Sequence, residues 1–388
     1  MNKLRFFEFF AGGGMARAGL GNGWDCAFAN DFDPMKAAAY SANWGDEHFK
    51  LADVNTLTTA DLPGQADLAW ASFPCQDLSV AGNAAGLGTE GAQTRSGAFW
   101  AFWRLMLALR REGRAPPVIV LENVYGVLTA HGGRDFAMIG RCLALDGYRF
   151  GAVLLDGTLF VPQSRPRIFI IGVRDDLSIP VDLVSEEPIS RWHPPAMSAA
   201  INRLAEPDLE CWHWWQLPLP TALPSELASL IEEQPDGVKW NNADQTARLI
   251  AMMNDVSLAK LAAMKADGKR RVGTIYKRTR PDGTGSRRQR AELRDDNIAG
   301  CLRTPGGGSS RQTILIVEGN SVRTRLLSIR EAARLMGLSD SYKLPARYND
   351  AYHVVGDGLI VPAVRHLTRH LIEPILAANA WPMLVAAE

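Results

Sequence analysis

The sequence lacks the features that mark membrane, secreted and metal-dependent proteins. Its five cysteines are scattered and form no C-x-x-C pair, which argues against a structural zinc site and against a disulfide framework. No apolar run is long enough to cross a bilayer, and the N-terminal residues do not have the pattern of a secretory signal. We therefore expect a chain of the reducing cytoplasm that binds no metal and no membrane.

Net charge and internal repeats are missing too. The chain has 42 Lys and Arg against 42 Asp and Glu, so its total charge does not indicate a nucleic-acid partner, although a neutral total can hide a local basic face. With 388 residues, 47% of them hydrophobic and 22% charged, the composition is that of a globular chain long enough for two domains.

The N-terminal segment predicts a strand, a glycine turn and a helix. Residues 4–10 are an aromatic strand, Gly12, Gly13 and Gly14 follow, and residues 15–20 have helical spacing. Glycines let the backbone approach a nucleotide-like cofactor closely, but such turns also join strands to helices for packing alone.

Two acidic residues after later strands favour an adenosyl cofactor. Asp31 follows a strand over residues 26–29 at a spacing of roughly 20 residues, where an acid can accept the hydroxyls of a ribose. The alternative for Asp31 is an N-cap ahead of Pro34, a role for which Asp33 is better placed. Asp53 could accept from an adenine amino group or simply cap a turn.

A cysteine follows the next predicted strand, residues 68–71. Pro74 holds Cys75 just past the strand end, at the rim of a sheet, where the active sites of open α/β folds gather. The glycine-containing segment 82–96 is interpreted as a mobile loop, with an exposed linker as the alternative. Cys75 is therefore a candidate nucleophile.

A carboxylate and two arginines are the next candidates. The continuous apolar run 118–121, typical of a central parallel strand, leads into Glu122, which is costly to bury without a partner. Arg165 and Arg167 flank Pro166 and could present guanidinium groups to phosphate, carboxylate or a base oxygen. Further strands are predicted over residues 148–155 and 167–172, and helices over 99–111 and 133–145.

From about Asp175 the alternation of strands and helices ends and prolines and tryptophans cluster, so we expect a domain boundary there. Residues 265–294 carry 11 Lys and Arg against 3 acids. A phosphate backbone would explain this basic run, and so would a solvated surface. Residues 303–312 offer exposed backbone, hydroxyls and an arginine, which suits a loop that reads base edges.

The C-terminal part returns to ordered helix. Ser328 and Glu331 form a capping-box pattern, residues 352–360 predict a glycine turn, and residues 361–376 predict a helix that packs back on the first domain.

Taken in order, five segments resemble the motifs of the C5-cytosine DNA methyltransferase family over nearly the whole chain. The segments are Phe10-Ala11-Gly12-Gly13-Gly14, Pro74-Cys75-Gln76 with Ser79, Glu122-Asn123-Val124, Gln163-Ser164-Arg165-Pro166-Arg167, and Arg325 to Gly337. The resemblance implies an α/β fold, a Rossmann-like and mostly parallel sheet with helices on both faces, over residues 1–174 and 323–388. It also implies a smaller, irregular target-recognition domain over residues 175–322.

The resemblance implies a chemistry as well. Cys75 would add to C6 of a cytosine flipped out of double-stranded DNA, and Glu122 would stabilise the added ring at N3. Arg167 would hold the base O2, and Arg165 would serve a phosphate or orient the site. S-adenosylmethionine would donate the methyl group to C5 and leave as S-adenosylhomocysteine.

The resemblance also assigns binding residues. The expected cofactor contacts are Phe10, Gly12, Gly14, Asp31, Phe32 and Asp53. The expected DNA contacts are Gln76, Ser79, Arg95, Arg287, Arg288, Gly307, Ser309 and Arg311. A monomer with a cognate restriction endonuclease as a candidate partner fits a bacterial enzyme of this kind.

The chain departs from the family pattern at two points. Leu78 stands where the family often has Phe, and Gly356-Asp357-Gly358 stands where it usually has Gly-Asn-Ser. The carboxylate of Asp357 could alter how the methionine end of the cofactor is held.

Three other functions are weighed against this one. A transfer-RNA methyltransferase would share the motifs, but the large segment 175–322 favours a reader of duplex DNA. A nicotinamide-dependent oxidoreductase could use the glycine turn, yet the strict G-x-G-x-x-G is absent and Pro74-Cys75-Gln76 would have no role. A catalytically silent DNA-binding relative would not need every catalytic position.

Overall fold

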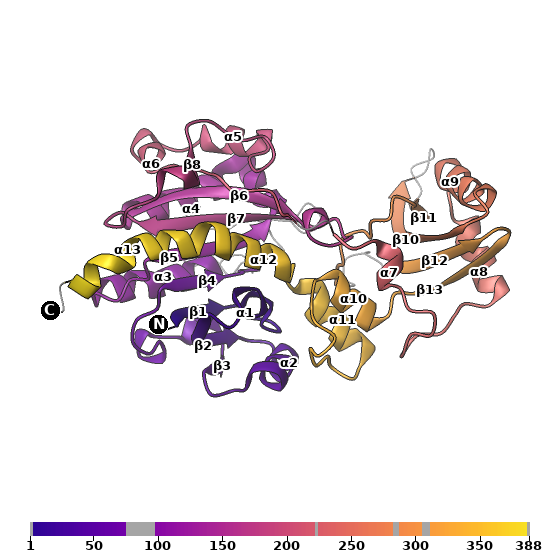
Figure 1. Cartoon of the computed structure of the whole chain (residues 1–388), viewed down its shortest axis with the longest axis horizontal. Coiled ribbons are helices and arrows are strands. Elements are labelled where there is room, and N and C mark those ends of the chain that lie inside the picture. Colours follow the sequence, from indigo (N-terminus) through magenta and orange to yellow (C-terminus); the bar gives the residue numbers. More distant parts are fainter. Residues whose placement is uncertain (1–2, 75–97, 222–223, 282–286, 305–310, 386–388) are drawn as a thin grey trace. The chain divides into compact units, whose positions relative to one another are not determined.

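The computed structural model describes residues 3–74, 98–221, 224–281, 287–304 and 311–385. The chain divides into two compact units (Figure 1). The first contains residues 1–155, 166–220 and 361–388, and the second contains residues 156–165 and 221–360.

The first unit is built on a seven-stranded sheet of order β3-β2-β1-β4-β5-β7-β6. The strands β1, β2, β3, β4 and β5 pair in parallel, and β7 runs antiparallel to β5. The bounds are β1 Leu4–Phe9, β2 Trp24–Asp31, β3 Phe49–Leu51, β4 Leu68–Ala71, β5 Val118–Val124, β6 Tyr148–Asp156 and β7 Pro166–Arg174.

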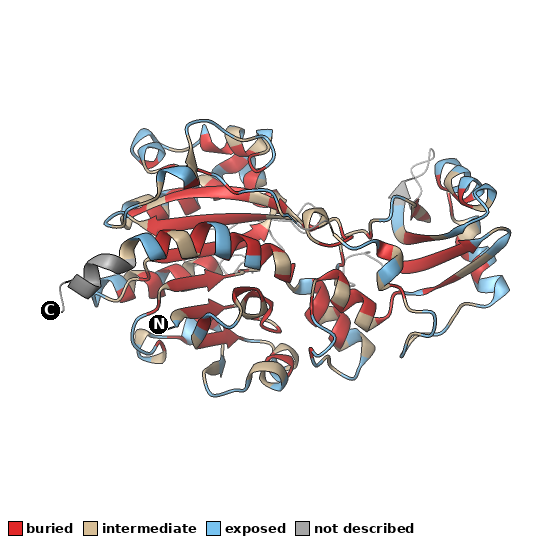
Figure 2. Cartoon of the chain, viewed as in Figure 1, coloured by how far each residue is buried: buried red, intermediate tan, exposed pale blue. Residues whose placement is uncertain are grey.

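Most strands of this sheet are largely buried, as Figure 2 shows in red, whereas the edge strand β3 has no buried residue. In β5 the run Val118 to Leu121 is buried at every position, which explains why the sequence there is continuously apolar rather than alternating. The helices of this unit are α1 Met15–Leu20, α2 Pro34–Trp44, α3 Ala98–Arg111, α4 Arg134–Leu145, α5 Pro195–Ile201, α6 Glu206–Glu210, α12 Val361–Leu367 and α13 Glu373–Val385.

The C-terminal helix packs on the first unit, as the sequence predicts. A π-helical turn at Thr368–Ile372 joins α12 to α13. Gly19 in α1 faces Val364 in α12 so closely that a Cβ on Gly19 would lie 2.4 Å from a Val364 carbon. The family-level expectation of an α/β fold with a mostly parallel sheet is confirmed.

Residues 175–220 belong to the compact first unit, although the expected boundary lies at Asp175. Two short strands, β8 (Val184–Ser185) and β9 (Trp214–Trp215), pair there. The rings of Trp212 and Phe150 meet edge to face at 5.5 Å, and the indole of Trp215 donates to the Ile171 carbonyl. The tryptophans that suggested a new domain therefore pack on the strands of the first.

The second unit contains a four-stranded antiparallel sheet of order β11-β10-β12-β13, so it is more regular than the sequence suggests. Its apolar core includes Ile275, Leu293 and Leu315. The strands are β10 Arg270–Pro281, β11 Arg287–Arg294, β12 Thr313–Glu318 and β13 Ser321–Leu326, and the helices are α7 Leu227–Leu230, α8 Ala243–Ala251, α9 Asp255–Ala266, α10 Ile329–Leu335 and α11 Tyr348–Asp357.

The expected catalytic segment 323–388 is divided between the units, because residues 323–360 belong to the second. Arg325 in β13 and Glu331 in α10 form a fully buried ion pair of 2.6 Å that ties this segment to the antiparallel sheet. The capping box of Ser328 and Glu331 is confirmed at the start of α10.

One predicted element is wrong. Residues 352–357 form the second half of helix α11 and not a glycine turn, and the helix ends at Asp357 with Gly358 as its C-cap. Ala351, Tyr352, Val354 and Val355 are buried, so packing of an apolar helix face outweighs the cost of Gly356 within the helix. Among the described residues, no helix is long and apolar enough to span a membrane.

Candidate active site

Four parallel neighbours, β2, β1, β4 and β5, bring the candidate residues to one edge of the sheet. Parallel strands have their carboxyl ends on the same side, and ligands of open α/β sheets bind there. The glycine turn follows β1, Asp31 ends β2, Phe73 follows β4, and Glu122 lies near the end of β5.

The turn after β1 is held in an unusual conformation. Phe10, Gly12 and Gly14 have φ values of 58°, 55° and 77°, and a bulky residue in this left-handed region is strained by about 1–3 kcal/mol. Asp31 stabilises the turn, since its Oδ2 accepts from the Gly12 amide at 2.8 Å. A carboxylate accepts several hydrogen bonds, so this contact leaves Asp31 able to accept from a ribose.

The other expected cofactor residues lie nearby in the same unit. Asp33 caps α2 by accepting from the Met35 amide at 2.9 Å, so the N-cap alternative for Asp31 is wrong. Asp53 accepts from both the backbone and the side-chain amide of Asn55 and so caps a turn, although it remains exposed. The ring of Phe32 is 66% exposed.

An adenosyl group fits these residues on two observations. A Cβ placed on Gly12 would meet no atom within 4 Å, so the backbone is open to a ligand there. The exposed Phe32 ring offers an apolar face of the kind that stacks on a base.

A buried acid lies beneath this edge and was missed by the sequence analysis. Glu8 in β1 is 1% exposed, and burial raises its pKa to about 8 against an opposing attraction from Arg17. Within the described residues its Oε2 has no hydrogen-bond partner. The sequence feature that could have indicated this buried acid is the single carboxylate within the mostly apolar, aromatic strand over residues 4–10.

Cys75 lies outside the described residues, but the segment that leads to it is fixed. Phe73 is buried, and its carbonyl accepts from Nδ2 of Asn123 at 3.2 Å. The Asn123 Oδ1 accepts from the Val124 amide at 2.8 Å. One side chain thus joins the ends of β4 and β5, a role that sequence reasoning did not assign to Asn123.

Glu122 has the partner that its burial requires. The Arg167 Nε lies 3.1 Å from Glu122 Oε1, with side-chain exposures of 15% and 9%. The antiparallel register of β5 and β7 pairs Val124 with Arg167, which brings the first residues of β7 beside the end of β5. The structure therefore unites the predicted acid with one of the two predicted arginines.

Arg165 belongs to the second unit and bonds to backbone there. Its guanidinium donates to the carbonyls of Leu302, Gly356 and Gly358 at 2.8, 2.9 and 2.7 Å, and the residue is 2% exposed. Gln163, which the sequence analysis gave no role, is fully buried and bonds to Leu302 and Leu335. Gln163 and Arg165 therefore link separate segments of the second unit to one another.

Asp357 also makes its described contact within the second unit. Its Oδ1 accepts a hydrogen bond from the Thr304 hydroxyl. The carboxylate that departs from the family pattern is thus engaged with the segment that enters residues 305–310.

The expected DNA contacts are only partly described. Gln76, Ser79, Arg95, Gly307 and Ser309 lie outside the described residues. In the β10–β11 hairpin, Arg288 is exposed and faces Arg280 across the strands, and Arg290 faces Arg278. Arg287 pairs with Pro281 in the same register. Arg311 lies over the Tyr348 ring at 5.4 Å and donates to Asn349.

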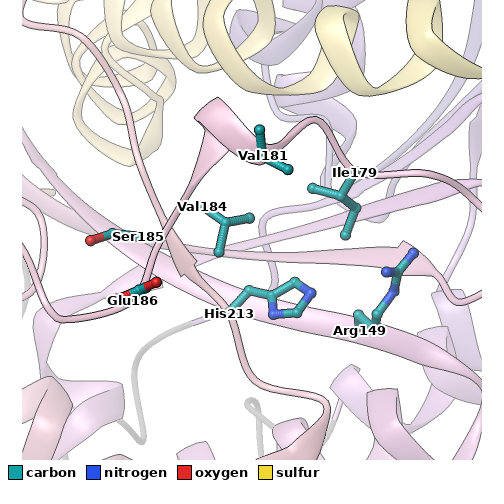
Figure 3. Close-up of a pocket in the computed structure, with 7 residues that line it drawn as sticks. All are labelled: Arg149, Ile179, Val181, Val184, Ser185, Glu186 and His213. Carbon is teal, nitrogen blue, oxygen red and sulfur yellow. The ribbon is translucent and has the colours of Figure 1, made fainter.

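A cavity of about 370 Å³ in the first unit contains none of the candidate residues. Figure 3 shows its valine and isoleucine side chains gathered above His213, with the Arg149 side chain to one side. The lining residues are Arg149, Ile179, Val181, Val184, Ser185, Glu186 and His213. Among the residues the structure describes, no group of three or more His, Cys, Asp or Glu could hold a metal ion.

Comparison with known proteins was made for the whole chain. The family model described as C-5 cytosine-specific DNA methylase matches residues 4–373. The type II methyltransferase M.HhaI of Haemophilus parahaemolyticus is 26% identical over 372 residues, covering 95% of this chain and 94% of that protein. The type II methyltransferase M.NlaX of Neisseria lactamica is 25% identical over 380 residues, covering 97% and 98%.

Solved structures share the fold. A Dnmt2 methyltransferase of S. pombe aligns with a TM-score of 0.58 at 18% identity, covering 96% of this chain and 99% of that one. The methyltransferase EhMeth of Entamoeba histolytica aligns with a TM-score of 0.62 at 12% identity, covering 96% and 99%. At these identities the likeness concerns the fold alone.

Proposed function

The chain belongs to the C-5 cytosine-specific DNA methylase family, and we propose that it methylates C5 of a cytosine flipped out of duplex DNA through a covalent adduct on Cys75. The observation that carries the proposal is the paired Glu122 and Arg167 at the same sheet edge as the segment leading to Cys75. An acid, a guanidinium and a thiol are the groups that this reaction needs around one pyrimidine.

The thiol answers the main chemical problem, which is that C5 of cytosine is a poor nucleophile. Addition of the Cys75 thiolate to C6 forms an S–C6 bond and gives C5 the character of an enamine carbon. S-adenosylmethionine supplies the methyl group when bound. A base or solvent water then takes the C5 proton, the electrons of the C5–H bond restore the C5–C6 double bond, and the S–C6 bond breaks to release the Cys75 thiolate.

The acid and the guanidinium stabilise the added ring. Glu122 holds a proton between its carboxyl and N3, so that charge does not build up on the ring when sulfur adds. Arg167 fixes the orientation of Glu122 through the 3.1 Å contact and offers its remaining N–H groups to the base O2. Both act in a mostly buried place, where electrostatic interactions are stronger than in water.

Arg165 is proposed as a residue that orients the site and not as a phosphate ligand. Its Nη1 and Nη2 donate to three backbone carbonyls of the second unit, which supports the orienting role. The cofactor residues are proposed to be Phe10, Gly12, Gly14, Asp31, Phe32 and Asp53.

Duplex DNA is the proposed substrate in preference to transfer RNA. The strands of the β10–β11 hairpin carry several arginines, among them Arg278, which pairs with Glu292 at 3.4 Å, and the exposed Arg288. A phosphate backbone would interact favourably with this excess of positive charge. We propose that target recognition within residues 175–322 is carried by the part from Thr221 onward, because residues 175–220 belong to the first unit.

The remaining proposals concern the setting. The enzyme is proposed to act as a monomer in the cytoplasm, without metal or membrane. Its relatives include type II methyltransferases and an orphan methyltransferase, M.SPRI of Bacillus phage SPR, so a cognate restriction endonuclease is a candidate partner.

Bisulfite sequencing of DNA from a host that lacks cytosine methylation and expresses the chain tests the proposal. We expect protected cytosines at one position of a short recurring sequence. Purified chain incubated with labelled cofactor and either duplex DNA or transfer RNA separates the two substrates. Label in transfer RNA alone, with no protected cytosine in the DNA, would overturn the proposed function.

A further inference from the structure

Trp44, the last residue of helix α2, lies directly against the glycine turn. Its indole Nε1–H donates to the Gly13 carbonyl at 3.1 Å. A Cβ on Gly14 would lie 2.4 Å from the same Nε1 and 2.7 Å from the neighbouring ring carbon. The absence of a side chain at Gly14 therefore makes room for the indole as well as allowing the φ of 77°.

The indole is itself fixed from the side of helix α1. The Arg17 guanidinium lies 5.0 Å from the centre of the Trp44 ring. It also donates to the Tyr40 hydroxyl at 3.0 Å and contacts Nε2 of His48. Tyr40 and Trp44 are four residues apart and share one face of α2, so Arg17 holds both. Arg17, which lies in α1 just after the turn, thus holds the Trp44 indole, and the indole in turn bonds to the Gly13 carbonyl of the turn.

The conformation of the turn explains why such support is needed. A residue as strained as Phe10 keeps its left-handed conformation only where several surrounding contacts hold the backbone in place. Asp31 holds the Gly12 amide from one side, and Trp44 holds the Gly13 carbonyl from the other. The two contacts fix the Ala11–Gly12 and Gly13–Gly14 peptide groups, on either side of the Gly12–Gly13 peptide.

We propose that Trp44 is a positioning residue for S-adenosylmethionine, whose indole N–H presets the Gly12–Gly14 turn in the conformation that binds. The inference rests on the proposed use of this turn by the cofactor. Presetting a backbone lowers the ordering cost of binding, so the contact contributes to cofactor affinity and not to the chemical step. Trp44 reaches the ligand only through the turn.

The alternative is that Trp44 has a packing role alone and that its N–H does not affect cofactor binding. Trp44→Phe distinguishes the two, because it keeps an aromatic ring and removes the N–H donor. Replacing Trp44 with benzothienylalanine, which keeps both rings and substitutes sulfur for N–H, serves as the second variant if Trp44→Phe folds poorly.

Trp24→Phe is the matched control. The Trp24 indole also donates a hydrogen bond inside the first unit, to Oε1 of Glu373 at 3.0 Å, but it lies on β2 and has no contact with the turn in the described structure. Its loss costs stability without reaching the cofactor.

The experiment measures the Kd of S-adenosylmethionine and of S-adenosylhomocysteine by calorimetry on the full chain, together with Tm, kcat at saturating cofactor and KM for DNA. We expect Trp44→Phe to weaken both ligands about fivefold to tenfold, the loss of roughly one hydrogen bond, while kcat and KM for DNA stay unchanged. Trp24→Phe is expected to keep the wild-type Kd.

Three results would overturn the positioning role while leaving the proposed function intact. They are an unchanged Kd in Trp44→Phe, an equal loss of affinity in Trp24→Phe, and a fall in kcat at saturating cofactor with no change in Kd. A wild-type chain that binds neither ligand would instead overturn the proposed function.

Discussion

The side-chain amide of Asn123 donates a hydrogen bond to the carbonyl of Phe73 across 3.2 Å. Asn123 directly follows the proposed acid Glu122, and Phe73 precedes the proposed nucleophile Cys75 by two residues. A substitution at Asn123, at the end of β5, therefore alters the position of the backbone at the start of the segment that carries the thiol.

Asn123→Leu tests this link, because leucine has a similar shape and cannot donate. The Phe73 carbonyl then loses a buried donor, and we expect kcat to fall about tenfold or more, since small misplacement of a reacting group is costly. Methyl-transfer assays at saturating DNA and cofactor give kcat, and calorimetry gives the cofactor Kd. An unchanged kcat in a folded variant would show that the Cys75 segment is positioned without Asn123.

Glu122→Gln removes the proton-holding carboxyl and keeps the size of the side chain. We expect kcat to fall about a hundredfold or more, the usual contribution of a general acid or base, with little change in affinity for DNA. Single-turnover methyl transfer is the measurement. Glu112→Gln, which breaks an exposed pair with Arg114, is the control and should behave as wild type. Near-normal turnover in Glu122→Gln would remove the acid from the mechanism.

The pKa of Glu8 predicts a pH-dependent stability. Burial raises this pKa from 4.5 to about 8, so below pH 4.5 the carboxyl is protonated in both folded and unfolded chains. As pH rises towards 8 the unfolded chain releases the proton that the folded chain keeps, and the free energy of unfolding falls.

Glu8→Gln cannot ionise and should lose this dependence. We expect its unfolding free energy, relative to wild type, to rise by an amount on the order of a few kcal/mol between about pH 5 and about pH 8. Urea titrations across that range measure it. Asp25→Asn, at an exposed pair with Lys3, is the control. Parallel curves for wild type and Glu8→Gln would mean that Glu8 is ionised in the folded chain.

The basic hairpin should act on DNA through charge. The double variant Arg288→Gln, Arg290→Gln is expected to weaken binding to all duplexes alike and to reduce the slope of log K against log salt by about 2. Titrations of a labelled duplex at several salt concentrations give the slope. Arg110→Gln with Arg111→Gln, two charges at the end of α3 in the first unit, is the matched control. Equal slopes for both pairs would remove the hairpin from the DNA interface.

Local patterns were sufficient to predict several elements of both units. The apolar run before Glu122, the cap at Asp33 and the capping box at Ser328 each depend on neighbours in the chain, and the structure contains all three. The cost of burying Glu122 also indicated a partner before any partner was known.

Long-range contacts could not be predicted in this way. The carbonyls that hold Arg165 lie 137 to 193 residues away in the chain, and the Thr304 partner of Asp357 is 53 residues away. Helix α11 was missed because Gly356 and Gly358 suggested a turn, whereas the outcome depends on the burial of Tyr352 and its neighbours. The support of the glycine turn by Trp44 depends likewise on how two helices pack.

The most direct test of the central claim is covalent trapping on a duplex whose target cytosine, identified by bisulfite sequencing, is replaced by 5-fluorocytosine. Fluorine at C5 cannot leave as a proton does, so the thiol that has added to C6 remains attached after methyl transfer. Proteolysis and mass spectrometry of the adduct are expected to find the methylated base on Cys75, with no adduct in Cys75→Ser. Methylation of the ordinary duplex by Cys75→Ser, or an adduct on another residue, would contradict the account.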